Sequence, residues 1–153
     1  MHIRQLSDLD IPNLLTVEEA AQSSPWSDAA FKRCFEANYL GWTAEVPGKM
    51  QGFIMISLNL GECHILNLCV HPTEQHKGIG RGLLLYALRW AKQVGAGMVY
   101  LEVRRSNLAA IGLYRKMNFK IIGERKEYYP HGQGREDALI FARDLGVEGI
   151  EIE

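Results

Sequence analysis

A chain of 153 residues with 47% hydrophobic and 23% charged residues has the composition of one globular domain with a single core. Its formal net charge of −1 excludes the strong positive field of nucleic-acid-binding proteins, so we expect no direct nucleic-acid partner. No apolar run approaches the ~18 residues that span a bilayer, and residues 1–5 lack the apolar core of a signal peptide. We therefore predict a cytoplasmic protein without membrane contact, and we expect a monomer.

The first helices follow a short strand predicted over residues 3–6. Ser7 can cap the helix that follows, whose first turn holds Pro12. A second helix is predicted from residue 26, with Phe31, Cys34 and Phe35 at helical spacing. Trp26 lies at the start of this helix, where its ring either packs as a hydrophobic staple or binds substrate.

Three strands come next, over residues 40–46, 50–58 and 63–70. The last of them is nearly continuously apolar, which predicts a central strand buried on both faces. It contains Cys63 and Cys69, which with Cys34 make an odd number of cysteines without the spacing of a metal site. We expect three reduced, buried thiols and no metal.

The segment after this strand predicts an anion site. A polar loop containing Gly78, Gly80 and Gly82 follows Pro72, and an apolar helix is predicted over residues 82–94. Glycines let the main chain approach a ligand, and a helix start offers free N–H groups and a positive dipole end. The pattern favours a pyrophosphate-bearing ligand, although a tight turn with glycines that serve only packing is the alternative.

Two familiar nucleotide loops fit poorly. No Gly-Lys-Ser/Thr triplet of a Walker loop is present, and five residues separate Pro72 from Gly78 where a dinucleotide fingerprint places glycine directly after the strand.

The second half of the chain continues with a strand over residues 98–103, parallel to strand 63–70 because a helix connects them. A helix over residues 108–117 ends at Asn118, which tolerates a left-handed C-cap. Two antiparallel strands, residues 119–127 and 138–144, flank a predicted loop that begins at Tyr128, and an acidic tail starts near residue 146. The order predicts an α/β fold, a mixed sheet of about seven strands with helices on both faces, in one domain over residues 1–153.

Three polar residues of this half have a structural and a functional interpretation. Glu102 is either on a half-exposed sheet face or a desolvated carboxylate suited to a general base. Tyr114 is either a core aromatic or part of a site, and Asn107 is either a helix N-cap or a ligand contact.

Together these motifs resemble a known family. Gln75-x-x-Gly78-x-Gly80 after a Val-x-Pro strand end resembles the acyl-coenzyme A loop of the GNAT N-acetyltransferase superfamily. The run from Leu101 to Phe119 resembles the family's second signature, with Asn118 in place of the usual glycine. Pro25-Trp26-Ser27, Tyr128-Tyr129-Pro130 and residues 134–138 resemble RimI-type enzymes, which acetylate the N-terminal alanine of a small-subunit ribosomal protein.

The resemblance implies an acetyl-CoA site where the fourth and fifth strands separate. Backbone groups of Leu68, Cys69 and Val70 would hold the pantetheine arm and the thioester, with an N–H near Val70 as oxyanion donor. Asn107 would bond to the cofactor arm. The pyrophosphate would lie on Gln75, His76, Lys77, Gly78, Ile79 and Gly80.

The resemblance also implies which residues take part in acetyl transfer to a protein N-terminus. Glu102 would be the general base and Tyr114, protonated at pH 7, the general acid. Trp26, Tyr128 and Tyr129 are candidate walls for the acceptor peptide, as are the residues near Glu18, and no metal or covalent enzyme intermediate is required. Acetylation of a small amine or a lysine, and a non-catalytic acyl-CoA binding module, are the alternatives.

Overall fold

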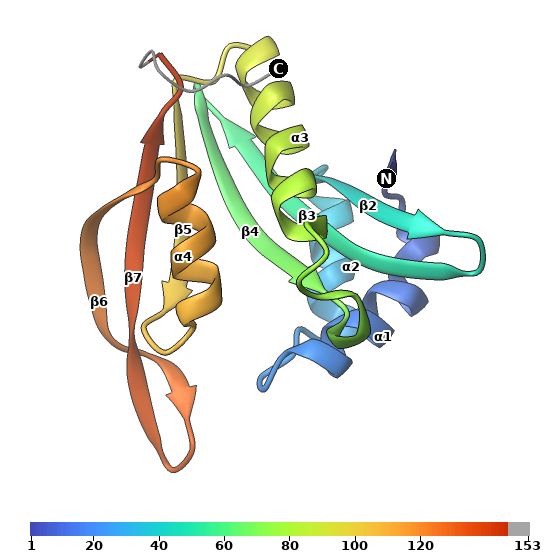
Figure 1. The fold of residues 1–153 in the computed structure, drawn as a ribbon, viewed down its shortest axis with the longest axis horizontal. Helices are drawn as coiled ribbons and strands as arrows, with labels where there is room; N and C mark the ends of the chain where they lie inside the picture. The colour runs from blue at the N-terminus through green and yellow to red at the C-terminus, as the bar shows by residue number, and fades with distance from the viewer. Residues whose placement is uncertain (147–153) are drawn as a thin grey trace. The chain divides into compact units, whose positions relative to one another are not determined.

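The computed structural model describes residues 1–146, and their strands form one mixed sheet in the order β1-β2-β3-β4-β5-β7-β6 (Figure 1). The predicted α/β class is confirmed, as is the mixed sheet, and β4 pairs with β5 in parallel. The predicted acidic tail lies outside the described residues beyond Gly146. The elements are β1 (His2–Gln5), η1 (Asp8–Asp10), α1 (Ile11–Ala21), α2 (Asp28–Glu36), β2 (Leu40–Val46), β3 (Lys49–Asn59), β4 (Glu62–Val70), η2 (Pro72–Glu74), α3 (Ile79–Gln93), β5 (Met98–Arg104), α4 (Leu108–Lys116), β6 (Lys120–His131) and β7 (Gly134–Asp144).

The chain groups into two compact units. Unit 1 holds residues 1–57 and 66–90, and unit 2 holds residues 58–65 and those from 91 onward. Both β4 and α3 contribute residues to each unit. A single domain over residues 1–153 therefore stays a prediction. None of the helices within residues 1–146 is long and apolar enough to cross a membrane.

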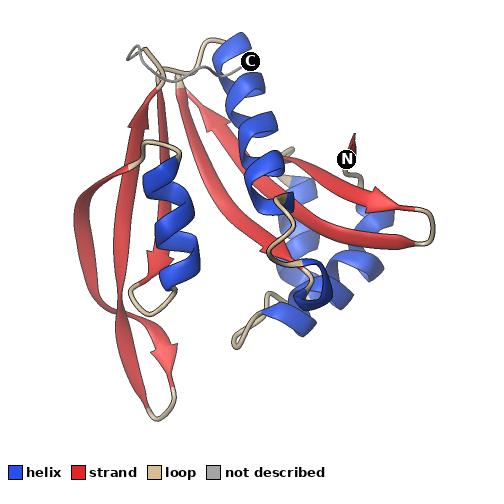
Figure 2. Ribbon diagram, viewed as in Figure 1, coloured by secondary structure: helices blue, strands red, loops and turns tan. Residues whose placement is uncertain are grey.

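Helices cover both faces of the sheet in unit 1 (Figure 2). Because successive strand residues point to opposite faces, Phe53 and Ile54 of β3 belong to different layers. Phe53 is fully buried and packs edge-on against Phe31 of α2, with ring centroids 5.7 Å apart. On the opposite face, Trp42 of β2 packs against Trp90 of α3, with ring centroids 5.4 Å apart. These two aromatic layers fix β2 and β3, the strands that precede the candidate site.

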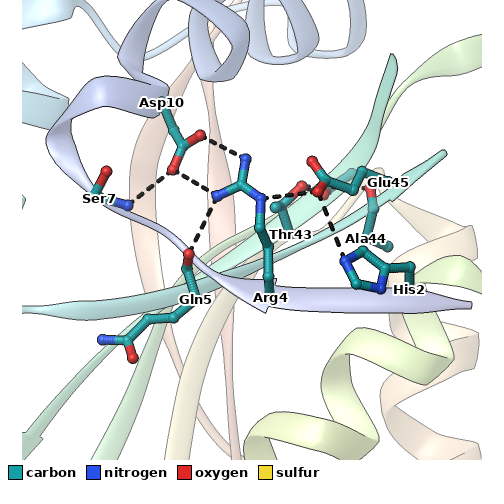
Figure 3. A network of polar contacts seen from close by, with 9 residues as sticks. His2, Arg4, Gln5, Ser7, Asp10, Thr43, Ala44 and Glu45 are labelled. Atoms are coloured by element: carbon teal, nitrogen blue, oxygen red, sulfur yellow. Dashed lines mark hydrogen bonds and ion pairs between the residues drawn. The ribbon is translucent and has the colours of Figure 1, made fainter. Parts of the chain in front are cut away.

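An arginine joins the first strand to its neighbours (Figure 3). Arg4 of β1 donates to Asp10 of η1 and to Glu45 of β2, each at 2.8 Å. The backbone N–H of Ser7 donates to the other Asp10 oxygen at 2.8 Å. The hydrogen bonds from Arg4 hold the pKa of the buried Asp10 carboxyl below its usual value.

Asp10→Asn should therefore destabilise the protein by about 1–3 kcal/mol at pH 7, because an amide N–H would face the Arg4 donors. A carboxyl with a lowered folded pKa stabilises above its unfolded value, near 3.9, and loses this contribution as the pH falls. The difference between the two proteins should thus shrink below about pH 4. Urea unfolding at several pH values measures it. The exposed Asp8→Asn is the control, and an equal loss there would assign the effect to charge alone.

In unit 2, α4 covers one face of the β5–β7 ladder (Figure 1). Tyr114 of α4 lies 6.0 Å from Phe141 of β7 between ring centroids. Phe141 pairs with Leu101, and both belong to the buried face. Glu102 alternates with Leu101, so its side chain lies on the other, half-exposed face.

The prediction that a loop begins at Tyr128 is wrong. Tyr128, Tyr129 and Pro130 lie within β6, and the hairpin turns only after His131. A β-bulge interrupts the regular pairing of β6, so the sequence pattern did not indicate that the strand continues. The pairs Arg125↔Ala138 and Tyr129↔Glu136 leave two extra residues in β6, and Glu127 adopts a left-handed backbone (φ 52°). Pro130 is tolerated because β6 is the edge strand.

Two other expectations need correction. The helix predicted from residue 82 begins at Ile79, because the left-handed Gly78 (φ +82°) ends the loop and Ile79 is buried. β4 is not buried on both faces, since its burial alternates. Its closely packed face includes Asn67 and Cys69, which bond to α1.

The three cysteines are free and buried, as predicted. Burial raises the pKa of all three thiols, that of Cys63 to about 12. They are therefore protonated and unreactive at neutral pH, which agrees with a packing role.

Candidate active site

The end of β4 directs its backbone groups in two directions. The N–H of His71 donates to the Gln51 carbonyl of β3 at 2.9 Å. Because alternate N–H groups of a strand point to the same side, the N–H groups of Leu68 and Val70 point away from β3. Gln75 donates its side-chain N–H to the Val70 carbonyl at 3.1 Å, which ties the loop to the strand.

The start of α3 has the features of an anion site. Its first hydrogen bond runs from the Gly82 N–H to the Gly78 carbonyl at 3.0 Å. The N–H groups of Ile79, Gly80 and Arg81 therefore lack an intrahelical acceptor and carry the positive end of the helix dipole. A Cβ on Gly78 would meet no atom within 4 Å, so its positive φ, rather than space, explains the glycine.

The loop's one carboxylate, Glu74, points inward, and neighbouring side chains balance its negative charge. It accepts from Lys77 at 2.8 Å and from Gln51 at 3.0 Å, and these bonds lower its pKa to about 2. The ammonium of Lys49 lies 4.0 Å away. The predicted cofactor residue Lys77 is thus engaged with Glu74, while the neighbouring His76 is exposed in a left-handed conformation (φ 64°).

Trp26 is held by a buried carboxylate. Glu18 of α1 is 1% exposed and accepts from the Trp26 N–H and from the Asn67 side chain, both at 2.9 Å. Glu18 is therefore internal, not an open peptide wall. The Trp26 ring lies 5.3 Å from Phe31, and one side of it borders a hollow of about 600 Å³ along α2.

Glu102 forms an ion pair that the sequence did not indicate. Arg125 of β6 donates from Nε to the Glu102 carboxylate at 2.9 Å. The Glu102 side chain is 27% exposed, which agrees with the half-exposed interpretation and not with the desolvated one. It is partly in contact with solvent and, among residues 1–146, has Arg125 as its charged partner.

Tyr129 lies near this carboxylate, and Tyr114 lies near Tyr129. Burial, followed by the negative charge of Glu102, raises the pKa of Tyr129 to about 12. Burial, followed by the influence of Tyr129, also raises the pKa of Tyr114 above its ordinary value. Tyr129 is thus influenced by Glu102 and itself influences Tyr114, while Tyr114 lies on the helix-covered face of β5 and Glu102 on the opposite face.

Asn107 caps α4, as its structural interpretation predicts. Its Oδ1 accepts from the Ala110 N–H at 3.2 Å. Because the cap uses only the carbonyl oxygen, the exposed amide nitrogen can still donate to a ligand.

The sequence did not predict the arginines around Tyr128 and Tyr129. The Arg104 guanidinium lies 4.5 Å from the Tyr129 ring centre and pairs with Glu136 at 3.1 Å. Arg125 lies 5.2 Å from the Tyr128 ring centre. The motif residue Arg104 was visible as part of the second signature, but Arg125 had no signal because its partner lies two strands away, across β7.

The similarity of this chain to known proteins decides its family. The model of the Acetyltransferase (GNAT) family matches residues 5–119. The chain belongs to this family. GNAT proteins are acetyltransferases that use acetyl-CoA.

The relatives of this GNAT chain match over nearly their whole length. The chain is 36% identical over 145 residues to the [ribosomal protein bS18]-alanine N-acetyltransferase of Escherichia coli K12, covering 95% of this chain and 98% of that protein. The crystal structure of the ribosomal-protein-S18-alanine N-acetyltransferase from Escherichia coli superposes with a TM-score of 0.91 at 35% identity, covering 97% and 96% of the two chains. The structure of yncA from Salmonella typhimurium with its cofactor acetyl-CoA shares the fold, with a TM-score of 0.78 at 18% identity, covering 99% and 97%.

Proposed function

We propose that this chain transfers the acetyl group of acetyl-CoA to the N-terminal α-amine of a ribosomal protein whose first residue is alanine. The similarity to the bS18-alanine enzyme over 95% of this chain carries the proposal. A ribosomal acceptor also implies a cytoplasmic reaction. We keep the expectation of a monomer that requires no metal and contacts neither nucleic acid nor membrane.

The cofactor contacts come from the groups described above. The free N–H groups at the start of α3, with Gln75, His76, Lys77 and Gly78, bind the pyrophosphate. Leu68, Cys69 and Val70 bind the pantetheine arm through their backbone, and Asn107 donates to the same arm. Phosphate binding by Lys77 requires that its ammonium is shared with or released from Glu74, which stays charged through its bonds to Gln51 and Lys77.

The chemistry needs one base and one acid. An α-amine with a pKa of about 7.7–8.0 is mostly protonated at neutral pH and cannot attack. Glu102 removes this proton, directly or through a water, and the amine nitrogen bonds to the acetyl carbon. The Val70 N–H donates to the carbonyl oxygen as negative charge develops there. The C–S bond then breaks, and the Tyr114 hydroxyl, kept protonated by its raised pKa, gives its proton to the thiolate. The nitrogen gives up its second proton, which reprotonates Tyr114, and Glu102 releases the first proton to solvent.

The acceptor peptide is bounded by aromatic residues. Tyr128 and Tyr129 flank the Glu102 face at the bulge of β6, where their rings contact each other at 4.9 Å. These two rings favour an acceptor peptide with a small first residue such as alanine or serine. Trp26, whose backbone is fixed by Glu18, stays a further candidate contact of the peptide.

Steady-state thiol release with short peptides tests this function. We expect turnover with an alanine-first peptide that has a free α-amine, and none when that amine is blocked, even if the peptide contains lysine. Turnover of the blocked, lysine-containing peptide, or of small amines alone, would support the alternative acceptors. Stabilisation by acetyl-CoA in a thermal shift without any thiol release would indicate a binding module.

A further inference from the structure

The half-exposed face of unit 2 carries a small, balanced set of charges. Two cations, Arg104 and Arg125, face two carboxylates, Glu102 and Glu136. Strand register explains their meeting, because Glu102 pairs with Ile140 and both Arg104 and Arg125 pair with Ala138. The small Ala138 side chain leaves room for the Arg125 side chain to cross β7 and reach Glu102.

The two arginines differ in how firmly they are held. Arg104 is 19% exposed, donates to the Pro130 carbonyl at 2.6 Å and pairs with Glu136. Arg125 is 55% exposed and, among the described residues, has Glu102 as its one carboxylate partner. Arg125 is the last regularly paired residue of β6 before the bulge, where the pairing with β7 is interrupted. Arg125 can therefore leave Glu102 at little cost, whereas Arg104 is held in place by Glu136 and the Pro130 carbonyl.

We propose that Arg125 occupies the acceptor-ammonium position on Glu102 in the free protein, and that the incoming acceptor displaces it. This rests on the proposed role of Glu102 as the base. A guanidinium and a primary ammonium are both cations that donate N–H groups to a carboxylate. Arg125 holds the Oε1 oxygen of Glu102, so an acceptor ammonium has to compete with Arg125 for this carboxylate. Entry of the ammonium beside both arginines would also leave an excess positive charge on this face, which the departure of Arg125 relieves.

Arg125 is thus a specificity-determining residue. An uncharged ligand gains nothing from Glu102 that would compensate for breaking the ion pair, so it leaves the pair intact. A primary ammonium replaces the pair with one of its own. The ion pair consequently lowers the affinity for every ammonium acceptor that has to displace Arg125.

The test compares Arg125→Met with the wild-type protein by steady-state thiol release from acetyl-CoA, using an alanine-first peptide. We expect the KM for the peptide to fall about two- to fivefold, the strength of an exposed ion pair, with the KM for acetyl-CoA unchanged. Arg125→Lys keeps a competing cation and should retain a KM near that of the wild type. Arg105→Met is the matched control, because Arg105 is 53% exposed and pairs with Asp137 on the same hairpin. It should leave the peptide KM unchanged.

An unchanged or increased peptide KM in Arg125→Met would overturn the proposal, as would an equal fall in Arg105→Met. A loss of kcat with constant KM would show that Arg125 only orients Glu102, and would also overturn it. If the wild-type protein acetylates a small amine or lysine instead, the proposed function fails, but the same KM comparison with that amine still decides the role of Arg125. A protein that acetylates no amine would contradict both.

Discussion

Glu102→Gln is expected to lower kcat/KM for the acceptor peptide by about 10²–10⁴-fold, the range typical of a general base. Glutamine keeps the size of the side chain and an oxygen that can accept from Arg125 Nε, but it cannot take a proton from the acceptor. The remaining activity should come from the small fraction of acceptor that is already unprotonated. Thiol release as a function of pH measures both effects, and the rise of the rate with pH should follow only the titration of the acceptor amine.

Glu124→Gln is the control for this substitution, since Glu124 is a partly exposed carboxylate of β6 that pairs with Lys126. Its kcat/KM should stay within about twofold of the wild type. Binding of acetyl-CoA, followed by thermal shift, should be the same in both variants. Unchanged turnover in Glu102→Gln would remove Glu102 as the base.

Tyr114→Phe is expected to lower kcat by about 10²-fold while the KM for acetyl-CoA changes little. The ring keeps its contacts with Phe119 and Phe141, so the fold should tolerate the change. The hydroxyl has a pKa raised above 10 by burial, so it stays protonated through the neutral and mildly alkaline range. An acid loses activity as the pH rises through its pKa. The wild-type protein should therefore show no alkaline loss due to Tyr114 below about pH 10.

Tyr100→Phe provides the matched control, because Tyr100 lies on β5 and stacks on His64 at 5.3 Å, away from α4. Its kcat should resemble that of the wild type. If Tyr114→Phe instead raises the KM for acetyl-CoA at constant kcat, Tyr114 is a wall of the site and some other group protonates the thiolate.

Local signals in the sequence account for much of the fold. The parallel β4–β5 pair followed from a strand, a helix and a strand in succession, because such a crossover has few alternatives. The left-handed Asn118 (φ 64°) and the capping role of Asn107 followed from their positions at the ends of one helix. These features depend on residues within a few positions of each other.

The features that escaped prediction depend on strand register. Alternation along β6 is interrupted at Glu127, so its second half read as a loop. The Glu102–Arg125 pair crosses β7, and no pattern in either strand specifies which residues face each other there. The Glu18–Asn67 bond joins residues 49 positions apart, and the sequence indicated Glu18 only as part of a candidate peptide wall.

The bulge of β6 also constrains how this hairpin can vary in length. Its two extra residues are an even number, so Tyr129 remains on the same face as Arg125 and Glu102. Asp137 secures the bulge by accepting from the Glu127 N–H at 3.0 Å. Insertion or deletion of one residue between Arg125 and Tyr129 would turn the tyrosine to the opposite face, whereas a change of two would restore it. Variation in the length of this segment should therefore be accepted in steps of two.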